Sequence, residues 1–287
     1  MNTVIQWITD WIKQGLIDAI MSKFTDLFGQ VNEQVGDIAA QVGQTPQAWN
    51  SSVFSMIQTL SETVVIPIAG MILTFVLTYE LIQMVIEKNN QADFDTFNLY
   101  KWVFKSAVAV YILTNCFTIV MAVFDVGQHV VNQSAGIISG SLDLNATLAD
   151  LQTQLEAMGV FELMGLWLET HIVGLCMSIL SIVIWVIVWG RMIEIYLTAS
   201  LAPIPMSTMV NREWGQMGNN YLKSLFAVAF QGFLIMICVA IYAVLVQGIS
   251  SAANVHGAIW GAAGYTVLLA FALFKTGSLS KSIFGAH

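Results

Sequence analysis

Residues 172–190, IVGLCMSILSIVIWVIVWG, form a run of 19 without a charged side chain. This length matches the ~20 residues that an α-helix needs to cross about 30 Å of hydrocarbon. Comparable apolar runs occupy 64–86, 107–126, 225–246 and 256–274. Because only helices satisfy their own backbone in lipid, we expect an all-α polytopic membrane protein with about five transmembrane helices.

The composition of the whole chain also indicates a lipid environment. Of the 287 residues, 57% are hydrophobic and only 10% are charged, and the mean hydropathy is +0.73. A soluble domain carries roughly 25% charged residues. These values exclude an ordinary soluble enzyme. The net charge of −8 argues against tight binding of nucleic acid by the bulk surface, because phosphate contacts need clustered lysine and arginine.

The N-terminal region follows a helical pattern instead of a spanning one. Over 1–45, apolar residues recur every three or four positions with charged residues between them. This pattern is typical of an amphipathic helix on a membrane surface or against partner helices. A core helix of a small soluble subdomain is the alternative. We therefore predict an external amphipathic region over 1–62 and a transmembrane domain over 63–287, with a second amphipathic helix in an external loop, 127–171.

One apolar segment, 192–210, differs from the spans because Pro203 and Pro205 each remove a backbone donor. Arg191 and Arg212 flank it, which places both of its ends on one side of the membrane. We predict a re-entrant or interfacial hairpin here, with broken backbone that a partner or another subunit must cover. A genuine span is the alternative.

The positions of lysine and arginine predict the orientation. With five spans, eight of the ten basic residues fall on one side, and the external loop 127–171 holds none. Acidic residues gather in that loop and in the N-terminal region instead. By the positive-inside rule, we expect an external N-terminus and a cytoplasmic C-terminus in the cytoplasmic (inner) membrane.

The sequence contains no catalytic constellation. Zinc-protease, dinucleotide-binding and phosphate-loop motifs are missing, and the cysteines and histidines show no metal-ligand spacing. We expect no enzymatic activity, no metal and no cofactor, although a bound phospholipid fits such a surface. Two carboxylates fall at span ends. Glu80 and Glu194 could serve an ion path, or they could pair with nearby cations such as Arg191.

Glycine spacing suggests close helix contacts. The N-terminal region and the last span both contain glycines at intervals that allow helix backbones to approach closely. These glycines are Gly15, Gly29, Gly36, Gly43, Gly257, Gly261 and Gly264. The spacing leaves open whether the partner helix is internal or belongs to another subunit.

The stretch 191–205, RMIEIYLTASLAPIP, and the five-span layout resemble TrbL-type proteins. These are the polytopic inner-membrane subunits of type IV secretion and conjugation machines. In that family, an apolar alanine/proline segment follows the middle span, and a tryptophan-containing cytoplasmic stretch leads into the next span. Trp214 matches that tryptophan, within a stretch that ends at Lys223. The resemblance is to the compact members found in Gram-positive conjugative elements.

The resemblance implies a channel subunit that assembles as a homo-oligomer, a ring beside other membrane subunits and ATPases of the secretion system. It would pass single-stranded DNA with its attached relaxase. A weakly charged wall suits the passage of a polyanion better than its capture. Two other classes stay open. One is a secondary transporter of a small solute or ion that uses Glu80 and Glu194, and the other is a non-conducting structural membrane scaffold.

Overall fold

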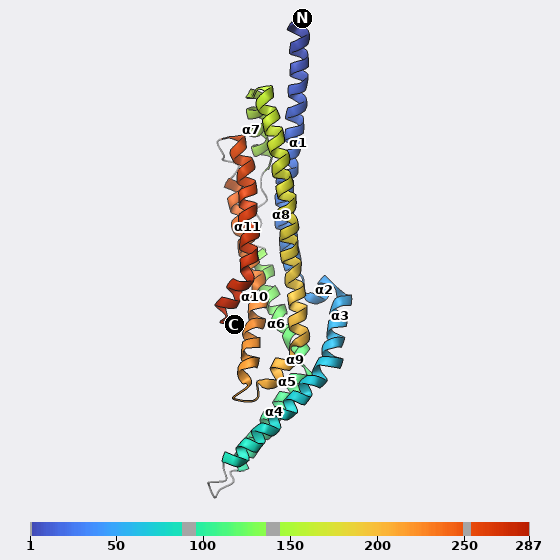
Figure 1. Cartoon of the computed structure of the whole chain (residues 1–287), viewed down its shortest axis with the longest axis vertical. Coiled ribbons are helices and arrows are strands. Elements are labelled where there is room, and N and C mark those ends of the chain that lie inside the picture. Colours follow the sequence, from blue (N-terminus) through green and yellow to red (C-terminus); the bar gives the residue numbers. More distant parts are fainter. Residues whose placement is uncertain (1, 88–95, 136–143, 249–253, 287) are drawn as a thin grey trace. The chain divides into compact units, whose positions relative to one another are not determined.

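The computed structural model describes residues 2–87, 96–135, 144–248 and 254–286 (Figure 1). Within these residues the chain is helical and forms no β-strand, so the all-α prediction is confirmed. The π-helical turn η1 (Ser61–Val65) joins α3 to α4. The α-helices are α1 (Asn2–Val42), α2 (Pro46–Trp49), α3 (Ser51–Leu60), α4 (Ile66–Glu87), α5 (Thr96–Thr114), α6 (Cys116–Ala135), α7 (Leu144–Ala157), α8 (Val160–Leu201), α9 (Pro203–Thr208), α10 (Gly215–Gln247) and α11 (Val255–Ile283).

Several of these helices are long and apolar enough to cross a membrane. Four qualify singly among the described residues: Ser51–Ile86, Val160–Leu201, Gly215–Gln247 and Val255–Ile283. A fifth is obtained if α5 and α6, which meet at an angle of 68°, are taken as one broken span. The protein is therefore a multi-pass helical membrane protein, and the expected number of about five spans agrees with the structure.

The span predicted at 107–126 is not one continuous helix. It is interrupted at Asn115, which separates α5 from α6. The Asn115 side-chain amide donates to the Tyr111 carbonyl at 2.9 Å, and the Asn115 backbone N–H donates to the same carbonyl at 3.2 Å. A side chain that competes for a helix carbonyl in this way disturbs the regular ladder. The lone asparagine in this apolar run marks a bend.

The boundaries predicted for the proline hairpin, 192–210, were too wide. Residues 192–201 continue α8, and Ala202 alone separates α8 from the short helix α9. Pro203 stands at the start of α9, where its missing N–H costs no helical hydrogen bond. The expected external loop 127–171 is also largely helical where it is described, since α6, α7 and α8 all extend into it. Residues 136–143 of that loop lie outside the described residues.

The chain divides into two compact units. The first unit contains Met1–Val42, Gln133–Trp189 and Ile235–Lys275. The second contains Gly43–Asn132, Gly190–Leu234 and Thr276–His287. Helices α8, α10 and α11 contribute residues to both. The functional division at residues 62 and 63 stays a prediction.

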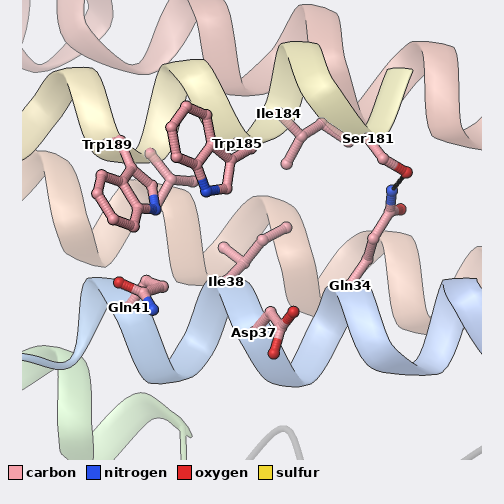
Figure 2. A pocket seen from close by; sticks show the side chains of 9 residues that line it. Gln34, Asp37, Ile38, Gln41, Ser181, Ile184, Trp185 and Trp189 are labelled. Carbon is pink, nitrogen blue, oxygen red and sulfur yellow. Dashed lines mark hydrogen bonds between the residues drawn. The ribbon is translucent and has the colours of Figure 1, made fainter. Parts of the chain in front are cut away.

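In the first unit, α1 packs its apolar face and runs parallel to α8. Its buried side chains recur at helical spacing and are Ile17, Ile20, Phe24, Leu27, Phe28, Val31, Ile38 and Val42. The Leu27 side chain lies beside Gly174, and the Gln34 amide donates to the Ser181 hydroxyl (Figure 2). The two contacting pairs have the same separation in sequence, so α1 and α8 run in the same direction with a constant register. The amphipathic helix predicted in the N-terminal region is confirmed.

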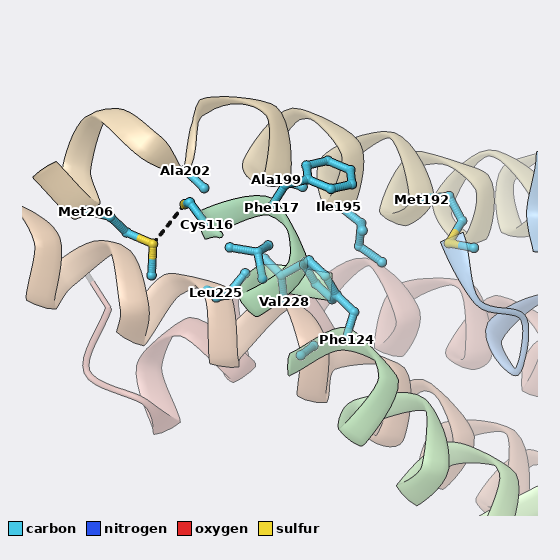
Figure 3. Close-up of a cluster of buried hydrophobic side chains, with 12 residues drawn as sticks. Cys116, Phe117, Phe124, Met192, Ile195, Ala199, Ala202, Met206, Leu225 and Val228 are labelled. Atoms are coloured by element: carbon cyan, nitrogen blue, oxygen red, sulfur yellow. Dashed lines mark hydrogen bonds between the residues drawn. The ribbon is translucent and has the colours of Figure 1, made fainter. Parts of the chain in front are cut away.

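The core of the second unit forms where α6, α8, α9 and α10 meet (Figure 3). Its buried apolar side chains include Cys116, Phe124, Ile195 and Met206. Helices α6 and α10 approach very closely at Gly127, where an added Cβ would lie 2.7 Å from the backbone oxygen of Ala229. Only glycine fits this crossing without a shift of the backbone.

Candidate functional site

The most unusual side chain in the second unit is Arg191 on α8, which is only 6% exposed. Its guanidinium lies against Gly232 of α10, where a Cβ would come within 2.7 Å of the Arg191 Nη2 atom. The Arg191 Nε atom is buried and has no hydrogen-bond partner among the residues that the structure describes. Burying a cation is costly, and an arginine inside a membrane helix marks a place of functional interest.

Glu194, one helical turn further along α8, does not form the expected hydrogen-bonded pair with Arg191. Its Oε1 atom instead accepts from the Lys281 Nζ of α11 at 2.9 Å. The carboxylate therefore ties two helices that are distant in sequence, while Arg191 interacts with it only as a nearby charge. The hydrogen-bonded pair that the i,i+3 spacing suggested does not form, because the Arg191 guanidinium is buried against Gly232 and Lys281 of α11 reaches the carboxylate instead.

Further polar contacts join α10 to α11 in the same unit. Gln231 donates to the Thr276 hydroxyl at 3.4 Å, and the Ser280 hydroxyl donates to the Ala227 carbonyl at 2.5 Å. We call Arg191, Glu194, Gln231, Thr276, Ser280 and Lys281 the polar layer. Sequence reasoning missed Gln231, Thr276 and Ser280. The available signal was Gln231, the one side-chain amide in the uncharged run 225–246.

Hydroxyl groups cover carbonyls around the proline break. Thr208 donates to the Pro205 carbonyl at 2.8 Å, and Ser207 donates to the Ile204 carbonyl at 2.6 Å. The Tyr221 hydroxyl of α10 donates to the Thr198 carbonyl at 3.0 Å. These three carbonyls thus have donors within the chain. That a partner or another subunit covers the carbonyls left without a donor by Pro203 and Pro205 stays a prediction.

Trp214 anchors the segment between α9 and α10 to α4. Its ring stacks on Phe75, with centroids 5.5 Å apart, and on Tyr79, with centroids 5.7 Å apart. The turn is held by Asn211, whose buried side chain accepts from the backbone N–H groups of Glu213 and Trp214 at 2.7 and 3.2 Å. The sequence singled out Trp214 but not Asn211, although asparagine ahead of a helix is a common capping signal. Lys223 is exposed on α10.

Glu80 of α4 forms an ion pair with Lys105 of α5. Both side chains are partly exposed, at 24% and 39% respectively. The pair joins the two helices, as the simpler interpretation of Glu80 expected.

The predicted packing glycines occupy open positions in this chain. An added Cβ at Gly15, Gly29, Gly36 or Gly264 would meet nothing within 4 Å. Gly43 lies just after α1, and its carbonyl accepts from the Gln128 amide. Gly257 is exposed, and in α11 the buried small residues are Ala258, Ala262 and Ala263 instead of Gly257 and Gly264. Gly261 is half-buried. A role for these glycines in contacts between subunits stays a prediction.

No group of three histidine, cysteine, aspartate or glutamate residues that could hold a metal occurs in the described part of the chain. His256 instead contacts Glu169 at 2.6 Å, and the Trp260 indole donates to the same carboxylate. The expected lack of catalysis and cofactors stays a prediction. The site consists of interhelical polar contacts and a proline break.

Comparison with known sequences identifies the family. No curated protein and no solved structure matches the chain. The family described as "TrbL/VirB6 plasmid conjugal transfer like protein" matches residues 31–203. This match covers more than half of the 287 residues and runs from α1 through α8 to Pro203, the first residue of α9. The chain therefore belongs to the TrbL/VirB6 plasmid conjugal transfer-like family.

Proposed function

We propose that this chain is a ring-forming channel subunit of a conjugative type IV secretion system in the cytoplasmic membrane. It passes single-stranded DNA with its attached protein and contacts the other membrane subunits and ATPases of that system. The observation that carries the proposal is family membership in a chain with several membrane-spanning helices. The positions of lysine and arginine support an external N-terminus and a cytoplasmic C-terminus.

The charge distribution supports passage of a polyanion. Strong phosphate-binding sites would slow release of DNA, because each basic contact adds affinity. Arg191 is the one deeply buried cation among the described residues, and its guanidinium packs against Gly232 of α10. It is therefore not accessible to a phosphate group of DNA. Exposed carboxylates, by contrast, are frequent on α1.

The carboxylate contacts favour a channel over the transporter alternative. Glu80 and Glu194 are each engaged by a lysine from a neighbouring helix, Lys105 and Lys281. Both carboxylates therefore have a structural use. A transporter would need a carboxylate that binds and releases a coupling ion, and these two contribute to helix packing instead.

A clean deletion of the gene tests the function. We expect DNA transfer to be abolished, growth to be unchanged, and a plasmid copy of the wild-type gene to restore transfer. Normal transfer by the deletion strain would reject the proposal. As a control, immunoblots of the deletion strain should show normal levels of the neighbouring subunits. This measurement separates loss of this chain from loss of the whole complex.

The ring is tested by the mass of the purified protein. After mild detergent extraction, light scattering should give a defined multiple of 31.5 kDa. The same measurement after reconstitution into lipid nanodiscs removes the effect of detergent. A strict monomer under both conditions would reject the ring.

A further inference from the structure

Helix α1 carries two different faces along its length. One face is apolar and buried in the first unit, as described above. The opposite face is exposed and contains Asp18, Asp26, Glu33 and Asp37, which we call the acidic face. Two of its carboxylates, Glu33 and Asp37, lie in the half of α1 that ends at Val42.

The contacts between α1 and α8 set the level of these carboxylates. Leu27 lies beside Gly174 and Gln34 bonds to Ser181, with the two helices running in the same direction. Glu33 and Asp37 are therefore level with residues near 180 and 184 of α8. Those residues form the middle of the run 172–190, which has no charged side chain and lies in a candidate membrane span. The C-terminal half of α1 is thus level with the part of α8 whose hydropathy is typical of a membrane span, although the sequence predicts that residues 1–62 are external.

Another side of α8 in the same unit has the opposite character. Helices α8 and α11 form a groove of about 300 Å³ whose lining includes Leu180, Val183, Ile187, Phe271 and Phe274. All of its lining residues are apolar, which suits the acyl chains of lipids. At one depth, the unit therefore presents an apolar surface on one side and carboxylates on another.

Carboxylates do not face hydrocarbon without a large cost, so at membrane depth they face water or protein. Asp37 is one of the residues that line the small cavity between α1 and α8, together with Ile38 and Gln41 of the same helix (Figure 2). An added Cβ at Gly29 or Gly36, beside the acidic face, would meet only open space. The acidic face is therefore accessible along its length.

We propose that the acidic face of α1 lines an aqueous path at membrane depth, enclosed by several copies of this chain. The inference rests on the proposed channel function and names the helix that borders its lumen. Copies related by a ring axis would turn their α1 helices inward and leave the grooves between α8 and α11 toward lipid. Repulsion between such carboxylates and phosphates would keep a passing nucleic acid from binding to the wall.

Single-cysteine accessibility in native membranes tests this inference. Cys116, Cys176 and Cys238 are first replaced by alanine, and one cysteine is then introduced at Glu33, Asp37, Ile38 or Val183. A membrane-impermeant methanethiosulfonate reagent is applied to spheroplasts and to inside-out vesicles. A lipid-soluble maleimide is applied in parallel. A Gln34→Cys/Ser181→Cys pair that forms a disulfide shows that α1 still packs on α8 in this background.

We expect E33C and D37C to react with the impermeant reagent at least tenfold faster than I38C and V183C. V183C, which faces an apolar groove, and I38C, which is buried, should both react slowly with either reagent, because a thiol in apolar surroundings stays protonated. The inference would be overturned if D37C did not react with the impermeant reagent from either side of the membrane. Equal reaction of V183C and D37C would also overturn it, because α8 would then lie in water.

The two proposals fail in different ways. If the deletion strain loses DNA transfer but D37C is unreactive, the lumen assignment is wrong and the channel function stands. If D37C reacts as expected but the deletion strain transfers DNA normally, the aqueous path exists and its assignment to conjugation is wrong.

Discussion

The polar layer of the second unit and the acidic face of α1 in the first unit place polar groups on apolar helices in two different ways. In the polar layer, Glu194 pairs with Lys281 and Gln231 contacts Thr276, so the polar groups join helices. On the acidic face, Glu33 and Asp37 are exposed. Polar groups that contact one another stabilise the packing of membrane helices. Charges that are exposed on an apolar helix must instead be solvated by water or contacted by another molecule.

The largest expected effect comes from breaking the polar layer at Arg191. Arg191→Glu would place a buried carboxylate one turn from Glu194, with an expected cost of about 3 kcal/mol or more. We expect the protein to be nearly lost from the membrane fraction, measured by immunoblot. Lys281→Glu is the matched charge reversal at a partly exposed position and should reduce the amount less. Equal losses for the two variants would show that burial does not distinguish these sites.

The next largest effect separates packed from open glycines. Gly127→Ala should destabilise the second unit by about 1–3 kcal/mol, because the new Cβ meets the Ala229 backbone oxygen. Gly36→Ala should instead stabilise α1 by up to about 1 kcal/mol, because alanine favours a helix and the site is open. Thermal unfolding in detergent measures both. Changes of the same sign would contradict the difference between the two regions.

A functional effect is expected on the acidic face. Asp37→Lys would give the wall a phosphate contact, and we expect DNA transfer to fall on the order of tenfold. Asp37→Asn keeps the size and polarity of the side chain and should transfer DNA nearly as well as wild type. Gln47→Lys adds the same cation at an exposed position of α2 and serves as control. Transfer is counted as transconjugants per donor at equal protein level.

The smallest effect is expected for the partly exposed pair in the second unit. Glu80→Gln removes the ion pair with Lys105 and should cost at most about 1 kcal/mol, because solvent screens such pairs. DNA transfer should stay near the wild-type level, and the unfolding temperature should shift only slightly. Complete loss of transfer with a normal protein level would give Glu80 a direct role in transfer and contradict its assignment to helix packing.

The sequence predicted the helices better than the contacts between them. The amphipathic period of α1 and the uncharged run 172–190 both led to the observed helices, because these signals are local. The bend at Asn115 was not predicted, although its cause is a single side chain that competes for the Tyr111 carbonyl. The width of the proline hairpin was overestimated because proline at the first position of α9 interrupts the helix only at Ala202.

The candidate site shows the same limit. Arg191, Glu194 and Trp214 were selected from their residue types, yet Lys281, Phe75 and Tyr79 could not be assigned to them. Residues on two apolar helices can pair in many registers of similar hydrophobicity. Only the packed arrangement selects one.

The amino-acid sequence is sufficient to identify a helical membrane protein and the family to which the chain belongs. Hydrophobicity and helical period are sums over neighbouring residues, so no tertiary contact is needed to read them. Two features are visible only in the folded chain: Glu194 contacts Lys281, and the acidic face of α1 lies level with the uncharged middle of α8. Such statements depend on which helices touch and in what register, and distant side chains settle that together through close packing.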